Sequence, residues 1–154
     1  MSAEQRLVEL GITLPSPPAV MGLYKPVIVV GSLAHTSGHG PLQADGKLTT
    51  GRLGDSLDVE AGYAAARLTG LAMLASLRAQ LGTLDKVQRL VKTLGLVCAT
   101  PEFTQHPAVI NGFSELMREV FGADAGVAAR SAFGTPSLPA GMAVEIEATF
   151  LLHP

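Results

Sequence analysis

The C-terminal sequence decides the fold: it reads Ala129-Arg130-Ser131-Ala132-Phe133-Gly134-Thr135, then a turn marked by prolines, then Val144-Glu145-Ile146-Glu147-Ala148-Thr149-Phe150-Leu151-Leu152. Both runs are typical of β-strands. In the second run two glutamates alternate with apolar residues, so both should lie on one face of the strand, opposite the aliphatic side chains. In the first run a lone arginine stands among small residues, which leave room beside it for a small carboxylate.

Arg130 has two candidate partners. A guanidinium is permanently charged and presents a rigid fork that matches a carboxylate in two parallel hydrogen bonds. That carboxylate could belong to a ligand. It could also belong to Glu145 or Glu147 on the adjacent strand, and from the residues alone such an internal ion pair is the favoured interpretation. A glutamate near a small buried site can hold and polarise a water, but a solvated strand face is the simpler interpretation for at least one of the two.

The elements before this end follow from periodicity and from breakers. Apolar residues at helical spacing predict a helix over 58–81, capped by Ser56 or Asp58 and ended by Gly82. Its Ala-rich face, with Gly62 and Gly70, suits close packing. The remaining predicted elements are a short helix over 3–10, an extended proline-rich arm over 13–18, a hairpin of strands 27–30 and 33–37, a strand over 87–99, and a second helix that opens at Pro107 and stops at Gly122.

The order is therefore strand, strand, helix, strand, helix, strand, strand. It predicts an α+β domain over residues 1–154, with one sheet and two helices packed on one of its faces. Residues 1–18 form an N-terminal extension. The other face of the sheet must be covered, and the sheet of another subunit is the cover we expect.

Composition narrows the function classes. Charged residues make up 16% of the chain and the net charge is -2. No run of Lys or Arg suggests a nucleic-acid partner, and the apolar stretches are too short for a membrane span. A single cysteine fits a soluble cytoplasmic protein. Of the four histidines, His35 and His39 are four apart, but they lie on a predicted strand and a glycine loop, so no metal site is expected.

Several motifs resemble those of one family. The most specific is Ala129-Arg130-Ser131 with Leu138-Pro139 and Val144-Glu145-Ile146-Glu147-Ala148. Weaker ones are Gly22-Leu23-Tyr24, Thr36-Ser37-Gly38-His39 and Val109-Ile110-Asn111. Together they resemble the Rid/YjgF imine deaminases, also called the L-PSP endoribonuclease family, from about Ala19 to Leu152.

This resemblance implies a chorismate-mutase-like fold and a homotrimer whose sheets line a central barrel, with ligand clefts between subunits and no cofactor or metal. Arg130 would grip the carboxylate of a 2-imino acid or its enamine, and Glu145 would help place the water that releases ammonia and a 2-keto acid. Tyr24 would wall the cleft, with Gly38 and Asn111 near it. Ser131 and Ala132 would also border the substrate.

The chain departs from the family pattern at Leu23, His39 and Ala132, where a proline, a glutamine and a cysteine are usual. His39 and Ala132 are expected to alter the wall that substrate and water share with Arg130. These departures indicate a divergent subgroup, so a non-catalytic binder of small carboxylates, such as a 2-keto acid sensor or regulator, is the alternative. A ribonuclease ranks last, because no basic stripe interleaved with aromatic residues could track a phosphate backbone.

Overall fold

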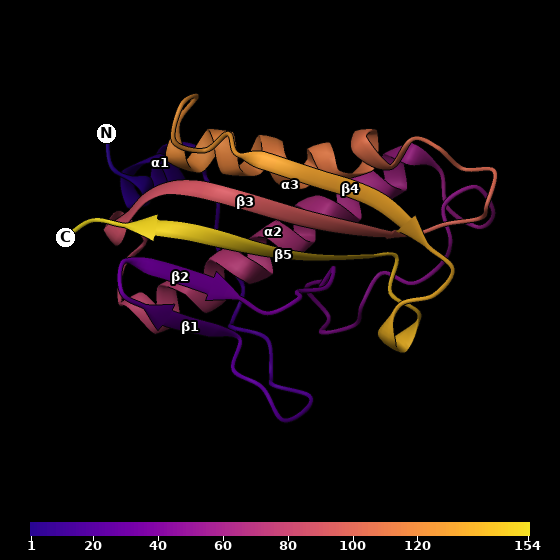
Figure 1. Cartoon of the computed structure of the whole chain (residues 1–154), viewed down its shortest axis with the longest axis horizontal. Helices are drawn as coiled ribbons and strands as arrows, with labels where there is room; N and C mark the ends of the chain where they lie inside the picture. The colour runs from indigo at the N-terminus through magenta and orange to yellow at the C-terminus, as the bar shows by residue number, and fades with distance from the viewer.

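A computed structural model describes all residues, 1–154. It contains one five-stranded sheet in the order β1-β2-β5-β3-β4, with the helices behind it (Figure 1). The strands are β1 (Val27–Val30), β2 (Leu33–Thr36), β3 (Val87–Cys98), β4 (Ala129–Thr135) and β5 (Val144–Leu152), and the helices are α1 (Ala3–Glu9), α2 (Val59–Leu81) and α3 (His106–Phe121), with short 3-10 turns η1 (Leu84–Lys86) and η2 (Pro139–Gly141). The predicted element order and the α+β class are confirmed.

The two long helices begin and end where the sequence predicts. Asp58 caps α2 by accepting a 2.8 Å hydrogen bond from the amide of Ala61. Pro107 lies in the first turn of α3, where its missing donor costs nothing. Gly82 and Gly122 follow the last helical residues. Local chemistry is therefore sufficient to define both helices.

Glycines allow α2 and α3 to lie very close together. A Cβ at Gly112 of α3 would overlap the backbone carbonyl of Tyr63 in α2. Gly62 and Gly70 of α2 leave the space that Val109 and Leu116 of α3 fill, which confirms that they serve close packing. The core lies between this helix pair and the sheet, and its largest members include Phe113, Ile110, Met117, Ile146 and Phe150.

The strand order corrects one expectation. β3 lies between β4 and β5, so the two C-terminal strands are not neighbours. β4 pairs with β3 in parallel, with Arg130 opposite Thr93, and β5 pairs with the other edge of β3, with Glu147 opposite Leu94. The reason is the crossover through α3, which returns the chain parallel to β3 and not beside the strand that follows.

An irregularity in β3 explains a lysine that breaks the apolar pattern of this strand. The register against β5 shifts between Leu90, opposite Phe150, and Lys92, opposite Thr149. A β-bulge changes which residues share a face. Leu90 consequently points into the core, whereas Leu94 and Leu96 lie with Lys92 on the other face.

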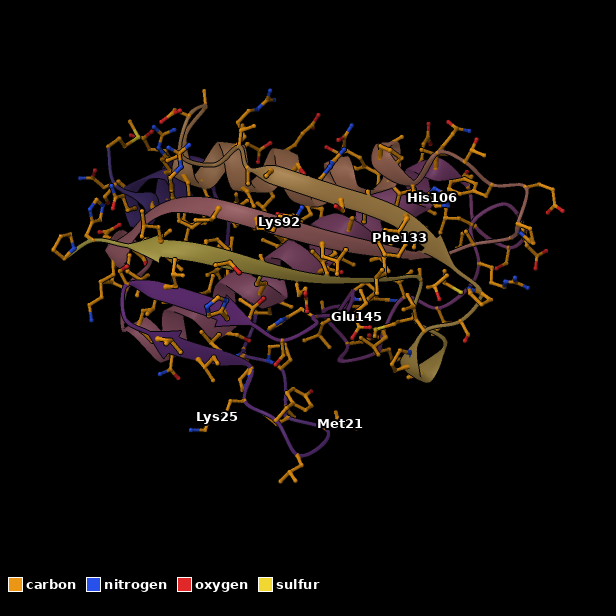
Figure 2. The ribbon with its side chains drawn as sticks, in the orientation of Figure 1. Met21, Lys25, Lys92, His106, Phe133 and Glu145 are labelled. Atoms are coloured by element: carbon orange, nitrogen blue, oxygen red, sulfur yellow. The ribbon has the colours of Figure 1, made fainter.

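The sheet face without helices carries exposed apolar side chains. Val30 and Phe133 are 61% and 50% exposed, and Ile28 is also exposed. Figure 2 shows Phe133 on this face together with Lys92 and Glu145. None of the helices has both the length and the apolar character that crossing a bilayer requires.

Candidate functional site

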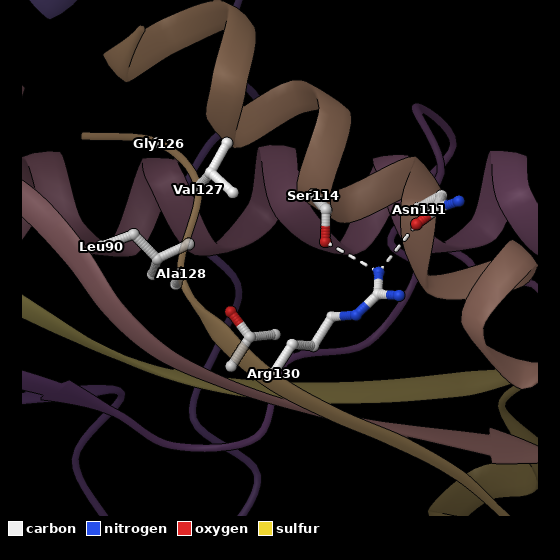
Figure 3. A pocket seen from close by; sticks show the side chains of 8 residues that line it. Leu90, Asn111, Ser114, Gly126, Val127, Ala128 and Arg130 are labelled. Carbon is white, nitrogen blue, oxygen red and sulfur yellow. Dashed lines mark hydrogen bonds between the residues drawn. The ribbon is translucent and has the colours of Figure 1, made fainter. Parts of the chain in front are cut away.

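Arg130 is held by neutral groups. One nitrogen of its guanidinium donates to Oδ1 of Asn111 at 2.8 Å and to Oγ of Ser114 at 3.1 Å, both on α3 (Figure 3). The ion pairs of the chain are Arg67–Glu119, Arg78–Glu4 and Arg89–Asp124. The expected ion pair between Arg130 and Glu145 or Glu147 is therefore wrong, because β3 separates the strands that carry them.

A pocket of about 220 Å³ lies beside Arg130, between β3, β4 and α3. Figure 3 shows Leu90, Val127 and Ala128 across from Ser114 and Arg130. The complete lining is Leu90, Thr93, Asn111, Ser114, Gly126, Val127, Ala128 and Arg130. Arg130 is the only ionisable residue of this set, so the pocket combines one cation with neutral and apolar walls.

Two other predicted site residues, Gly38 and Glu145, are in contact with each other, and Tyr24 lies in the loop before β1. A Cβ at Gly38 would lie 2.8 Å from Cδ of Glu145, so only a glycine fits there without moving the carboxyl group. Burial, and then the charge of Glu147, raise the pKa of Glu145 above its ordinary value. Tyr24 is exposed, and its hydroxyl accepts a 3.4 Å hydrogen bond from the amide of Met21.

Within one chain Arg130 meets neither Glu145 nor Tyr24. Arg130 points towards α3, whereas Glu145 alternates with the buried Val144 and Ile146 and therefore lies on the helix-free face. Tyr24 precedes β1, which is the opposite edge of the sheet from β4. Figure 2 shows its neighbours Met21 and Lys25 in the loop that leads into β1, away from Phe133 of β4.

The two residues that follow Arg130, Ser131 and Ala132, lie on opposite faces of the sheet. Ser131 accepts a 3.3 Å hydrogen bond from Nζ of Lys92, which lies on the helix-free face. Ala132 lies on the same side as Arg130 and packs against the core. Of the two, only Ala132 shares the face of Arg130.

His39 has a structural position. It is 5% exposed, with Nδ1 2.8 Å from the carbonyl oxygen of Ser37 and Nε2 2.9 Å from Oγ of Ser76 in α2. Burial lowers the pKa of its imidazole, against the opposing effect of the Ser37 carbonyl. Nε2 therefore connects the loop after β2 to α2, whereas Nδ1 contacts a carbonyl of the same loop. The effect of His39 on the wall beside Arg130 stays a prediction.

Two polar residues of the pocket, Ser114 and Thr93, were absent from the sequence-based prediction. Ser114 lies three residues after Asn111, so both side chains share one face of α3. That spacing could have identified it. Thr93 is placed beside Arg130 only by the parallel register of β3 and β4, which no local pattern reveals.

The family model described as "YjgF/chorismate mutase-like, putative endoribonuclease" matches residues 4–147. The chain belongs to this family. The chain is also similar to a Trypanosoma cruzi protein, "Protein TCP17". The two are 42% identical over 147 residues, which span 96% of this chain and 92% of that protein.

Solved structures agree with the family assignment. The Agrobacterium tumefaciens protein Atu1372, described as having unknown function, is 39% identical with a TM-score of 0.89, covering 98% of this chain and 92% of that one. A "putative endoribonuclease" of Shewanella oneidensis is 33% identical with a TM-score of 0.93, covering 99% and 100%. Escherichia coli TdcF with bound serine shares the fold, at 20% identity and a TM-score of 0.62 over 90% of this chain and 94% of that one.

Proposed function

We propose that this family member hydrolyses reactive 2-imino acids, or their enamine tautomers, to 2-keto acids and ammonia. The observation that carries this proposal is Arg130, a guanidinium with only neutral partners beside a pocket without any other charge. Asn111 and Ser114 aim the cation and leave its charge uncompensated. A carboxylate ligand would compensate it.

The chemistry of small carboxylates is consistent with this site. The bidentate geometry of a guanidinium suits a planar carboxylate, which every 2-imino acid carries. TdcF, which shares the fold, holds serine, a small molecule with a carboxylate next to a nitrogen-bearing carbon. We therefore propose Arg130 as the carboxylate-binding residue.

Glu145 is our candidate for handling the water. The pKa of its carboxyl group is raised towards neutral pH, which suits a group that takes and returns a proton. In the proposed reaction the water oxygen bonds to the imine carbon as the C=N π bond opens onto the nitrogen, and a water proton passes to Glu145. Glu145 returns this proton to the nitrogen. The hydroxyl proton of the adduct then moves to the nitrogen as the C–N bond breaks, which leaves the keto group and ammonia.

Bringing Glu145 to Arg130 requires a second copy of the chain. Arg130 lies on the β4 edge, and Tyr24 precedes the β1 edge. Glu145 lies on β5, the central strand, and is in contact with Gly38, which follows β2 on the β1 side of the sheet. We propose a homotrimer in which the β4 edge of one subunit meets Gly38, Glu145 and the loop of Tyr24 of the next. The exposed Val30 and Phe133 would become buried in it.

The test is release of ammonia from 2-imino acids that an amino acid oxidase generates in the assay. Wild-type protein should accelerate this release, and Arg130→Ala should lower kcat/KM at least about a hundredfold, as expected for loss of a charge-assisted pair. Arg118→Ala, an exposed arginine of α3, is the matched control. Equal rates for wild type and Arg130→Ala would contradict the proposal.

A second candidate function is a non-catalytic receptor for small carboxylates. It is favoured by Ala132, the next residue of β4 on the face of Arg130, because its methyl group cannot take part in proton transfer. Binding of a 2-keto acid that depends on Arg130, without any release of ammonia, would identify this function instead.

A further inference from the structure

We propose that the pocket beside Arg130 is a side-chain subsite, in which Thr93 selects ligands whose short, uncharged side chain ends in a hydroxyl group. The inference rests on the proposed carboxylate site at Arg130 and adds the class of side chain that the site accepts.

Thr93 differs from the other buried threonines in the bonding of its hydroxyl group. Three threonines are buried. Thr36 accepts a 3.0 Å hydrogen bond from the amide of Ala148, and Thr69 donates one of 2.9 Å to the carbonyl of Ala65. Thr93 is only 1% exposed, yet its hydroxyl has no partner in the chain.

This hydroxyl opens into the pocket. Nε of Arg52 is the only side-chain nitrogen or oxygen that is both sealed from solvent and unpaired, so the Thr93 oxygen is not sealed. Thr93 lines the pocket, and it lies directly opposite Arg130 in the parallel pair of β3 and β4. Because paired strands lie about 4.8 Å apart, one small molecule can reach both side chains.

The remaining walls define the ligand. Leu90, Val127 and Ala128 are apolar, and Ser114 already accepts a hydrogen bond from Arg130. A second charge on the ligand would remain unpaired here, and an unpaired charge is costly to bury. The volume of about 220 Å³ corresponds to about seven waters at about 30 Å³ each, which is ample for a small ligand. Because Thr93 lies directly opposite Arg130, only a short side chain places its end at Thr93 while the carboxylate stays on Arg130.

A hydroxyl is the group that completes this pocket. It can pair with Thr93, whereas a methyl group of the same size displaces water and leaves the threonine unpaired. Sites with a buried polar group discriminate against ligands that cannot satisfy it. We expect a preference of about tenfold or more for the hydroxylated ligand.

The experiment measures dissociation constants by titration calorimetry with the full-length protein. The ligands are hydroxypyruvate and 2-oxobutanoate, which carry the same 2-keto acid group and differ by a hydroxyl in place of a methyl. Wild type should bind hydroxypyruvate about tenfold more tightly. Thr93→Val, which keeps the shape but removes the hydroxyl, should bring the ratio close to one. Thr69→Val is the matched control and should keep the wild-type ratio, because Thr69 is buried outside the pocket.

The negative results distinguish a failure of the side-chain subsite from a failure of the carboxylate site. A wild-type ratio near one overturns the subsite whether or not Thr93→Val folds, and so does a tenfold ratio that survives in Thr93→Val. If both acids bind equally and Arg130→Ala abolishes both, the carboxylate site stands without the subsite. If wild type binds neither acid, the carboxylate site is overturned and the subsite with it.

Discussion

One guanidinium nitrogen of Arg130 donates to Oδ1 of Asn111 across 2.8 Å, so that α3 sets the direction of a cation carried by β4. The same nitrogen donates to Ser114, and neither partner bears a charge. The arrangement orients the arginine without neutralising it. A structural arginine would be expected to have a carboxylate partner, as Arg67 has in Glu119.

Asn111→Asp should weaken the binding of carboxylate ligands to Arg130. The change keeps the side-chain shape but puts a carboxylate at hydrogen-bonding distance from Arg130, where it competes with the carboxylate of the ligand. Binding of a 2-keto acid should weaken at least about tenfold, whereas the melting temperature should stay at or above that of wild type, because a new ion pair contributes up to about 1 kcal/mol. Calorimetry and thermal unfolding measure the two effects. Unchanged affinity would show that ligands do not use Arg130.

Gly38→Ala should displace the Glu145 carboxyl group without unfolding the protein. The added Cβ meets the flexible end of Glu145, which can move away. We expect kcat for ammonia release to fall at least tenfold with little change in melting temperature. Gly22→Ala is the control, because its Cβ makes only ordinary 3.5 Å contacts with the ring of Tyr24. Full activity in Gly38→Ala would remove Glu145 from the mechanism.

Glu145→Gln should change how stability depends on pH. The pKa of Glu145 is higher in the folded state than its ordinary value of 4.5, so the folded chain binds this proton more readily than the unfolded chain. The free energy of unfolding therefore falls as the pH rises above 4.5. The variant carries no charge at this position and lacks that loss. Its melting temperature should exceed that of wild type more at pH 7 than at pH 4. An equal difference at both pH values would contradict the raised pKa.

His39 should make the fold sensitive to acid. Its pKa is lowered from the ordinary 6.5, so the unfolded chain binds a proton at a pH where the folded chain does not. The contribution is complete above pH 6.5 and is lost as pH falls below it. His39→Gln should therefore lose less stability than wild type between pH 7 and pH 5, measured by urea unfolding at each pH. Parallel losses in the two proteins would be evidence against a buried neutral imidazole.

Ser76→Ala tests the same contact from the other side. It leaves Nε2 of His39 buried without its 2.9 Å partner. The free energy of unfolding should fall by about 1–3 kcal/mol, the cost of an unpaired buried polar group. Denaturant unfolding at pH 7 measures this free energy. Ala79→Gly, at an exposed position of α2, is the reference for a change that weakens the helix without removing a buried contact. A change below that reference would mean that water replaces the hydroxyl.

Local chemistry was sufficient to predict the elements and their order. Asp58, Pro107, Gly82 and Gly122 act on their own helix ends, and the alternation around Glu145 places it on one face of its strand. These effects extend over a few residues, so the printed sequence contains them. The motif around Arg130 likewise indicated the family, which the match over residues 4–147 confirms.

The tertiary structure alone decided which side chains meet. The crossover through α3 inserts β3 between β4 and β5, which takes Glu145 and Glu147 away from Arg130 and puts Thr93 opposite it. Packing of the loop after β2 against α2 buries His39 next to Ser76, 37 residues away. Such contacts depend on strand register and helix packing between distant segments. The sequence by itself therefore determined the elements and the presence of an unusual arginine, and the fold determined that this arginine has neutral partners and a pocket beside it.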